Sequence, residues 1–458
     1  MSALSPKIDA AIDAVRGRTI PGTFNAVSLG LVGWGVLALA YGLFGGDLQL
    51  KSQTWGALLT AMFYAFGLCQ GAVVFSGVLT GTQARWGRPL KRVAEAFAFF
   101  LPFTWLGLLL VASLGSGIYP WHPEAWAVEL GAPAVNLAPH GQAPAAKELW
   151  LTPGFFFVRQ IIGIGLLFAL QFVYLRASLK PDLIAAKARL GADAPGWWSF
   201  FTGSDTDAKA ASESGQVTQS TLVPFLGFAY AIIYSIASFD LLMSLDPWWF
   251  SNMFGGWLFM SSFWLGMVAV GAATVASRDW LSLNNWITPN ITLDLGKLIL
   301  AGCMFWAYTL YAQILPIYYT NVPEETNYLL VRLMLDEWSW MSRLVAVLCF
   351  LAPFTILLSR GIKKMRWPFF VLCALIMTGL FFERTLLVMP SVYLDRTFPW
   401  VSFLIVNVGI FAGTLGALFN VWARVIAQTP AVPVTDPYLD DHPWDVHVHS
   451  LDDAHAHH

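Results

Sequence analysis

Long apolar stretches separated by short polar segments dominate the pattern of this chain. Each has about 20 or more residues, enough to cross a hydrocarbon core of about 30 Å as an α-helix. Ten such stretches cover residues 23–45, 53–80, 93–117, 152–175, 222–245, 252–275, 295–319, 338–358, 367–389 and 400–425. The short alternating segments of a transmembrane β-barrel are not visible. The sequence therefore predicts an all-α fold, a polytopic transmembrane helical bundle with about ten spans.

Composition supports an integral membrane protein. Of the 458 residues, 57% are hydrophobic and only 12% are charged, and the mean hydropathy is +0.60. Ordinary soluble domains contain roughly 25% charged residues. Nothing in this composition indicates nucleic-acid binding.

Three regions follow from the pattern. Residues 1–21 form an N-terminal segment without the apolar core of a signal peptide, and either an interfacial helix or a frayed end fits them. Residues 22–425 form the transmembrane domain, in which the inner loop 177–220 ends in a polar stretch that we expect to be flexible. Residues 426–458 form a tail rich in His and Asp, for which solvated disorder is favoured over metal binding.

The distribution of basic residues predicts the orientation of the bundle. Cytoplasmic loops of membrane proteins are enriched in Lys and Arg. If the N-terminus is cytoplasmic, 19 of the 26 basic residues lie in inner segments or the inner ends of helices. The other seven are Lys51, Lys147, Arg159, Arg332, Arg343, Arg384 and Arg396. Both termini are therefore expected in the cytoplasm, and the protein in a bacterial inner membrane.

Histidine and cysteine positions exclude several cofactors. All eight histidines fall outside the apolar stretches, so haem b, which needs facing imidazoles within the bilayer, is not expected. The cysteines, Cys69, Cys303, Cys349 and Cys373, are widely spaced within the spans, without a Cys-x-x-Cys motif. We therefore expect no metal site and no cofactor bound by this chain alone.

Charged residues within the spans are the main functional candidates, because a charge in a bilayer is costly and is usually functional. Five from four spans are expected in the outer third of the membrane: Arg159, Asp240, Arg343, Glu383 and Arg384. One interpretation is a structural network of ion pairs. The alternative is a polar pocket or proton route that opens outward.

Hydroxyl groups on the fifth span favour the proton route. Ser235 and Ser238 are one helical turn apart, and Tyr230 and Tyr234 continue the series toward the cytoplasm. A ladder of hydroxyls that ends at Asp240 would carry protons through water molecules.

Two further charges are expected near the inner surface. Glu95 lies just inside the third span and Lys297 just inside the seventh. Both side chains can reach the interface, which is the favoured interpretation. Alternatively, Glu95 marks the mouth of an inner proton path.

Two loop segments complete the list of candidates. Residues 239–251, Phe-Asp-Leu-Leu-Met-Ser-Leu-Asp-Pro-Trp-Trp-Phe-Ser, join spans five and six, and Asp246 is expected to cap the sixth helix. Residues 321–326, Asn-Val-Pro-Glu-Glu-Thr, follow span seven, where Glu324 and Glu325 are expected to begin a short outer helix, with Arg332 after them. Contact with periplasmic partners is the functional alternative for these residues.

With the ten-span pattern, these two segments resemble the ActF-type subunit of bacterial alternative complex III, one of the NrfD-like, polysulfide-reductase-type membrane proteins. The resemblance covers residues 22–425. It implies a membrane subunit of a quinol:electron-acceptor oxidoreductase, with a sister NrfD-like membrane subunit, a periplasmic iron–sulfur protein and multihaem c-type cytochromes as partners. Haem c and iron–sulfur clusters would then belong to the partners, and a quinone would bind at an interface, among lipids.

The lack of an intramembrane histidine favours a supporting role, as a scaffold that conducts protons beside a catalytic sister subunit. Asp240 or Glu383 would be the group that accepts protons at a quinone site. A secondary transporter and a purely structural anchor are the alternatives. The transporter predicts helices interrupted at mid-depth.

Overall fold

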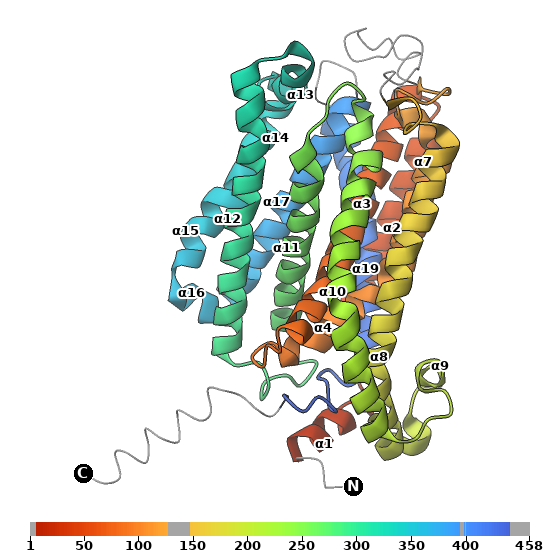
Figure 1. Cartoon of the computed structure of the whole chain (residues 1–458), viewed down its shortest axis with the longest axis vertical. Coiled ribbons are helices and arrows are strands. Elements are labelled where there is room, and N and C mark those ends of the chain that lie inside the picture. Colours follow the sequence, from red (N-terminus) through yellow and green to blue (C-terminus); the bar gives the residue numbers. More distant parts are fainter. Residues whose placement is uncertain (1–5, 127–146, 394–397, 399, 440–458) are drawn as a thin grey trace, which may run out of the picture.

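The structure is a computed structural model that describes residues 6–126, 147–393, 398 and 400–439. Ten of its helical segments are long and apolar enough to cross a membrane, and no strand occurs among the described residues. The predicted all-α, ten-span bundle is therefore confirmed. Figure 1 shows the helices packed side by side, with α1 at the same end as the last described residues. We call this the terminal end and the opposite one the far end.

Five spans are uninterrupted helices: α2 (Gly22–Phe44), α3 (Leu48–Gly81), α11 (Asn252–Ser277), α12 (Pro289–Thr320) and α17 (Arg366–Val392). The fifth span is α10 (Ala208–Leu241) with the short helix η8 (Met243–Leu245) after it. The third combines η1 (Arg88–Leu90), α4 (Lys91–Ala96), η2 (Phe97–Phe100) and α5 (Leu101–Leu114).

Each of the remaining three spans contains a π-helical segment. These spans are α7 (Pro153–Arg159), η6 (Gln160–Ile164) and α8 (Gly165–Leu190); α14 (Asp336–Ala346), η9 (Val347–Leu351) and α15 (Ala352–Leu358); and α18 (Trp400–Ser402), η10 (Phe403–Val408) and α19 (Gly409–Ala427). The fourth span ends with the short helix η7 (Gly191–Asp193). Short helices outside the spans are α1 (Pro6–Asp13), η3 (Ser116–Ile118), α9 (Trp198–Thr202), α13 (Pro323–Leu333) and α16 (Arg360–Lys364).

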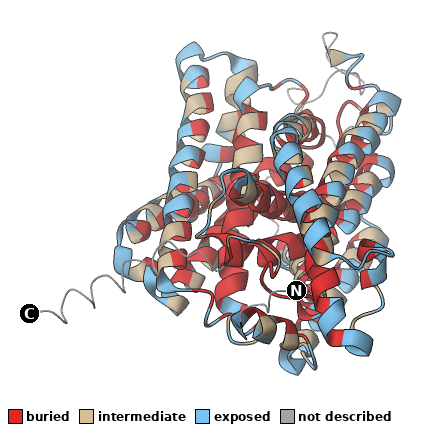
Figure 2. Cartoon of the chain, turned by 60° about the horizontal axis from the view of Figure 1, so that its bottom comes forward, coloured by how far each residue is buried: buried red, intermediate tan, exposed pale blue. Residues whose placement is uncertain are grey.

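Helix α3 forms the centre of the bundle, and it packs closely against α11. Its residues are almost all buried, whereas most of α2 is not. Figure 2 shows buried residues in the middle of the bundle and exposed ones around it. A Cβ atom on Gly71 would lie 2.2 Å from the Ser262 carbonyl oxygen, and one on Gly266 would lie 2.3 Å from the Ala72 nitrogen. These glycines therefore let the two backbones approach as small residues do between membrane helices.

Most of the polar part of the inner loop is helical. The prediction that Gly203 to Ser220 is flexible is therefore wrong from Ala208 onward. Helix α10 begins at Ala208, where the side chain of Asp207 accepts hydrogen bonds from the backbone N–H groups of Lys209 and Ala210. This extension packs on α8, since a Cβ atom on Gly215 would lie only 2.5 Å from the Ala177 carbonyl oxygen. Packing against a neighbour thus outweighs the polar composition.

Both terminal segments pack on the bundle as far as they are described. The N-terminal segment forms the helix α1, whose Asp9 and Asp13 pair with Arg189. After α19, residues 428–439 continue along the terminal end, where Val432 and Leu439 are buried. Residues 440–458, which hold all six histidines of the tail, lie outside the described residues.

The sixth helix begins later than expected. Helix α11 starts at Asn252, after Ser251, so Asp246 does not cap it. Asp246 instead accepts hydrogen bonds from the backbone N–H groups of Trp248 and Trp249 in the loop before α11. The Asp-Pro sequence closes this loop, and the helix starts only after the aromatic run that follows.

We expect Gly71→Ala to destabilise the protein by about 1–3 kcal/mol, because the added methyl group overlaps the α11 backbone. Thermal unfolding in detergent measures the effect. The matched control is Gly30→Ala on α2, where a Cβ atom has no neighbour within 4 Å. Equal melting temperatures for both variants would show that the α3–α11 approach does not limit stability.

Candidate functional site

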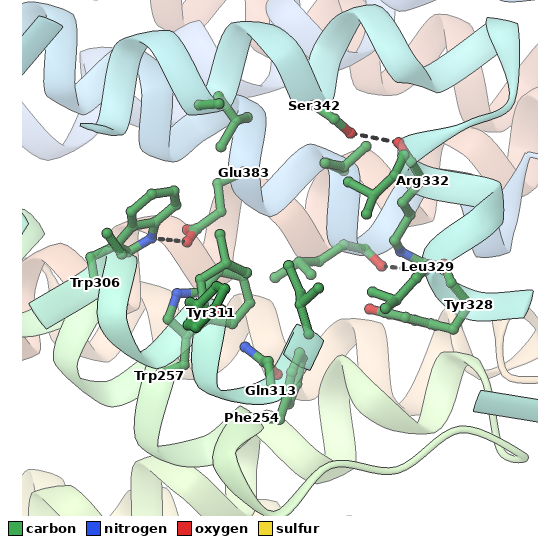
Figure 3. A pocket seen from close by; sticks show the side chains of 18 of the residues that line it. Phe254, Trp257, Trp306, Tyr311, Gln313, Tyr328, Leu329, Arg332, Ser342 and Glu383 are labelled. Carbon is green, nitrogen blue, oxygen red and sulfur yellow. Dashed lines mark hydrogen bonds between the residues drawn. The ribbon is translucent and has the colours of Figure 1, made fainter. Parts of the chain in front are cut away.

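A cavity of about 550 Å³ lies between α11, α12, α13, α14 and α17 in the far half of the bundle. Its walls are mainly aromatic and aliphatic, and Trp249, Trp257, Trp306 and Tyr328 contribute the largest side chains. Figure 3 shows Glu383 and Trp306 on one side of this cavity and Arg332 and Tyr328 on the other. Apolar walls with a few polar groups are typical of ligand sites in proteins.

The cavity opens on the outer, lipid-facing surface of the bundle. Tyr311 of α12 and Leu333 of α13 line it and are also exposed. Tyr311 lies within the span α12, so a bilayer around the spans would cover this opening, and an apolar molecule could enter from the lipid.

The carboxylate of Glu383 has one partner on another helix and one on its own. Trp306 Nε1 donates to Glu383 Oε1 (2.6 Å), and the neighbouring Arg384 pairs with the other carboxylate oxygen. Arg384 also donates to Ser261 Oγ (2.6 Å) and Ser262 Oγ (3.1 Å) on α11. We call these five residues the Glu383 cluster. Charge and hydrogen bonds together satisfy groups that would otherwise be costly to bury.

Arg332 is a buried cation on α13, outside the spans. It donates to the carbonyl oxygens of Tyr328 (3.1 Å) and Leu387 (3.1 Å) and to Ser391 Oγ (2.8 Å), and it stacks on the Tyr328 ring at 3.4 Å. Burial raises the pKa of the Tyr328 hydroxyl to about 12. Burial also raises the pKa of the Asp246 carboxyl group, and the positive charge of Arg332 partly offsets this rise. The Tyr328 hydroxyl therefore stays neutral at physiological pH.

A second cluster surrounds Asp240, which has no exposed surface. Arg159 binds both carboxylate oxygens (2.9 Å each), while Trp150 Nε1 (2.8 Å) and Gln160 Nε2 (2.7 Å) complete the shell. The Arg159 guanidinium also lies over the rings of Trp150 and Phe155, at 4.0 and 4.4 Å. We call Asp240, Arg159, Gln160 and Trp150 the Asp240 cluster. With every carboxylate oxygen paired, it fits a structural ion pair.

The five charges expected to converge thus form two clusters at different depths. Asp240 ends α10 at the far end, whereas Glu383 is the eighteenth of the 27 residues of α17 and lies closer to the middle of the span than expected. Arg343 joins neither cluster; it lies on the exposed side of α14 and donates to Ser339 Oγ (3.4 Å). The place of Glu383 along its span differs from expectation because α17 continues past the apolar stretch to Val392.

The expected hydroxyl ladder to Asp240 is not formed. Ser235 and Ser238 donate to main-chain carbonyls of their own helix, those of Ala231 and Tyr234. Tyr230 donates to the Phe259 carbonyl (2.6 Å), and the Tyr234 hydroxyl bonds Ser262 Oγ (2.6 Å). Tyr234 is therefore connected to the Glu383 cluster through Ser262.

A third cluster lies toward the terminal end and is centred on Arg92 of α4. Arg92 pairs with Glu95 and with Asp182 of α8 (2.6 Å), and it donates to Ser178 Oγ (2.8 Å). Glu95 accepts further hydrogen bonds from Ser76 Oγ (2.8 Å) and Ser178 Oγ (2.7 Å). We call these five residues the Arg92 cluster. Its three charged side chains are at most 3% exposed. Each of them therefore needs the opposite charge of its neighbours to remain ionised.

Of the two inner charges, Glu95 differs from the favoured interpretation and Lys297 agrees with it. Glu95 does not extend to the interface, because Arg92 neutralises it in the interior. Lys297 does reach the surface, where its side chain is 57% exposed and pairs with Asp294 at 2.7 Å.

A polar cavity of about 240 Å³ adjoins the Arg92 cluster at the terminal end. Arg88, Lys91 and Gln219 are among its lining residues, and Lys91 Nζ donates to Gln219 Oε1 (2.7 Å). The segment after α19 also lines this cavity. The Thr435 backbone N–H and hydroxyl donate to Asp182, and Asp436 pairs with Arg88 at 3.0 Å.

Buried polar groups continue along α3 between the Arg92 and Glu383 clusters. Ser76 bonds the Tyr174 hydroxyl (2.9 Å), and Gln70, six residues earlier, accepts from Gln171 of α8. Among the described residues, the Gln70 amide nitrogen and the Gln171 carbonyl oxygen find no partner. Gln70 is one turn from Gly67, where a Cβ atom would lie 2.7 Å from the Tyr234 hydroxyl. The series thus reaches from the terminal end to mid-depth.

The sequence contains a local signal for part of this series. Arg92 and Glu95 are three residues apart, and Ser178 and Asp182 are four apart, spacings that place each pair on one helix face. Asp182 was missed because it follows the apolar stretch 152–175, whereas α8 continues to Leu190. No local pattern identifies Gln70, Trp306 or Gln171 as members of a cluster.

The expected partner contacts lie at the far end. Helix α13 begins at Pro323, so the short outer helix after span seven is present, with Glu325 half-buried in its first turn. The side chain of Glu324 lies outside the described residues. Asp246 is half-buried, and Arg332 points inward, which does not fit a surface contact.

No protein-family model matches the sequence, and no curated protein matches it either. In the part of the chain that the structure describes, no three His, Cys, Asp or Glu side chains are placed to hold a metal ion. A function therefore has to explain the lipid-facing cavity and the buried polar series.

We expect Arg92→Gln to destabilise the protein by about 3–5 kcal/mol, because Glu95 and Asp182 lose their buried countercharge. Unfolding by heat or denaturant in detergent measures this loss. Lys297→Gln is the control, since an exposed ion pair contributes about 0–1 kcal/mol. Similar losses for both variants would show that the Arg92 cluster is solvated rather than buried.

Proposed function

We propose that this protein is an integral membrane subunit of a quinol-oxidising respiratory complex, and that it lines a quinone site and conducts protons. The observation that carries the proposal is the aromatic cavity that opens toward lipid and holds the buried carboxylate of Glu383. Quinones are apolar molecules with a polar ring, so they partition into the bilayer and need both apolar walls and polar partners. The resemblance of the two loop segments to the ActF-type subunit supports the same assignment.

Different residues of the cavity offer different interactions to a quinone ring. Trp257, Trp306 and Tyr328 offer aromatic surfaces for stacking. Glu383 offers an acceptor and Arg332 a cation from the other side (Figure 3). Quinol oxidation releases two protons and two electrons; Glu383 is the residue placed to take a proton, and the electrons leave to partner subunits.

The buried polar series supplies a route for protons between this cavity and the terminal end. Arg384 stays protonated and cannot relay a proton, so a proton on Glu383 needs water molecules to reach Ser262 and Tyr234 and then Gln70 and Gln171. The unpaired amide atoms of those two residues are the partners that such water molecules need. From Ser76 the Arg92 cluster leads to the polar cavity.

The remaining partners and the orientation belong to the same proposal. A sister NrfD-like subunit, a periplasmic iron–sulfur protein and multihaem c-type cytochromes would bind this chain, with the redox proteins at the far end beside α13. The terminal end would face the cytoplasm of a bacterial inner membrane, as the basic residues predict. The alternative of a secondary transporter predicts interrupted helices at mid-depth; the described residues of each span form continuous helical segments.

Filling the cavity tests the quinone site. We expect Ala307→Phe to lower binding of a photoreactive short-chain quinone by about tenfold or more, because Ala307 lines the cavity. Ala301→Phe makes the same change two turns earlier on the exposed side of α12 and should leave labelling unchanged. Labelling that is equal in both variants would place the quinone elsewhere.

Neutralising the carboxylate tests the proton acceptor. We expect Glu383→Gln to slow quinol oxidation by about 10²-fold in the purified complex, the lower range for a positioned general base, while quinone labelling persists. Glu325→Gln, on the surface of the same end, serves as the control. Normal turnover in an assembled Glu383→Gln complex would contradict a role for Glu383 as proton acceptor and would favour a purely structural anchor.

Purification identifies the assembly. Gentle extraction from the native membrane, with mass spectrometry and a visible spectrum, should recover c-type haem proteins and an iron–sulfur subunit with this chain. A colourless protein that is stable alone would contradict the proposal and favour the transporter.

A further inference from the structure

A second apolar cavity, of about 530 Å³, lies toward the terminal end of the bundle. Helices α2, α11, α17 and α19 form its walls. Small residues of α11, Ala272, Ala273 and Ala276, leave the space, and Trp280 and Trp422 lie at its end. We propose that this groove binds one anionic phospholipid, with an acyl chain between the helices and the phosphate at the terminal surface.

The depth of the groove matches one leaflet of a bilayer. Its deepest residue on α17, Thr378, is twelve residues after Arg366, the first residue of that helix. Twelve residues span about 18 Å, and half of a hydrocarbon core is about 15 Å. A transmembrane helix of a partner would need a groove across both leaflets, so the dimensions favour a lipid chain.

Only the terminal half of each wall takes part. The groove uses Phe24 near the start of α2, residues 272–277 at the end of α11, and residues 415–422 in the last part of α19. Tryptophan side chains mark the surface end, where Trp280 also donates to the Thr19 carbonyl oxygen at 2.8 Å. Such a position is typical of tryptophan at the membrane interface.

Basic residues do not line the groove, but four arginines lie in or contact the chain segments at the terminal ends of its walls. Arg366 donates to the Val275 carbonyl oxygen (3.0 Å), which places its guanidinium between α11 and α17. Arg18 donates to the carbonyl oxygens of Ile426 and Thr429 (3.2 Å each), and burial lowers its pKa to about 10, so it remains charged. Arg278 and Arg424 lie in the segments that end two of the walls.

Acidic residues do not balance these cations. Of the four arginines, only Arg366 has an ion pair among the described residues, with Asp279 at 2.6 Å. Arg18, Arg278 and Arg424 instead donate to carbonyl or amide oxygens, and Arg278 Nε has no partner. A phosphate is the anion that such a set of guanidinium groups recognises, and basic pockets between helices on this side of a membrane bind anionic headgroups.

The test uses the full-length protein in nanodiscs of phosphatidylcholine with or without phosphatidylglycerol. Native mass spectrometry after release should show one retained phosphatidylglycerol per protein in preference to phosphatidylcholine. Ala374→Phe fills the groove from α17 and should abolish retention, whereas Val371→Phe, on the exposed face of the same helix, should not.

A charge variant tests recognition of the lipid headgroup separately from binding of the acyl chain. Arg366→Gln should lower the preference for phosphatidylglycerol by about fivefold, while Arg360→Gln, an exposed cation nearby, should change it little. Equal retention in Ala374→Phe and Val371→Phe, or a wild-type protein that holds phosphatidylcholine equally well, would overturn the proposal. A quinone or a partner helix in the groove would overturn it as well.

Discussion

The approach of α11 to α3 is the constraint on which the rest of this bundle depends. Gly67, Gly71 and Gly266 remove the side chains that would hold the two backbones apart. Lipid offers no hydrophobic drive for helices to associate, so close packing of this kind has to supply the stability. The same approach brings Ser262 to Tyr234 and Arg384, so the packing contact also places the polar groups at mid-depth.

A single physical rule then explains where the buried charges lie. Within a membrane, each charge needs a countercharge and enough hydrogen bonds, and the three clusters supply both at three depths. The clusters differ in whether they border a cavity. The Asp240 cluster closes on itself, whereas the Glu383 and Arg92 clusters each border a cavity, one apolar and one polar. The proposed function follows from that difference.

Much of the fold could be predicted from the sequence, because the requirement for about 20 apolar residues per span is local along the chain. The ten stretches accordingly agree with the ten helices. Helix ends were less predictable, since α8 and α10 extend into polar sequence by packing on each other. For the site, Glu383, Arg384 and Glu95 could be identified as buried charges. Their partners could not, because Trp306, Asp182 and Gln171 come from other helices and no local pattern records that contact.

The three π-helical segments have a consequence for how this fold can vary. A π turn holds one more residue than an α turn, so the loss of one residue within η6, η9 or η10 would leave a regular helix. A full turn would remain after such a deletion, so the helical parts on its two sides would keep nearly the same facing. In η6, for example, α7 and α8 would keep their neighbours in the bundle. Related chains are therefore free to differ in length by single residues inside a span, where a change of function would require no new loop.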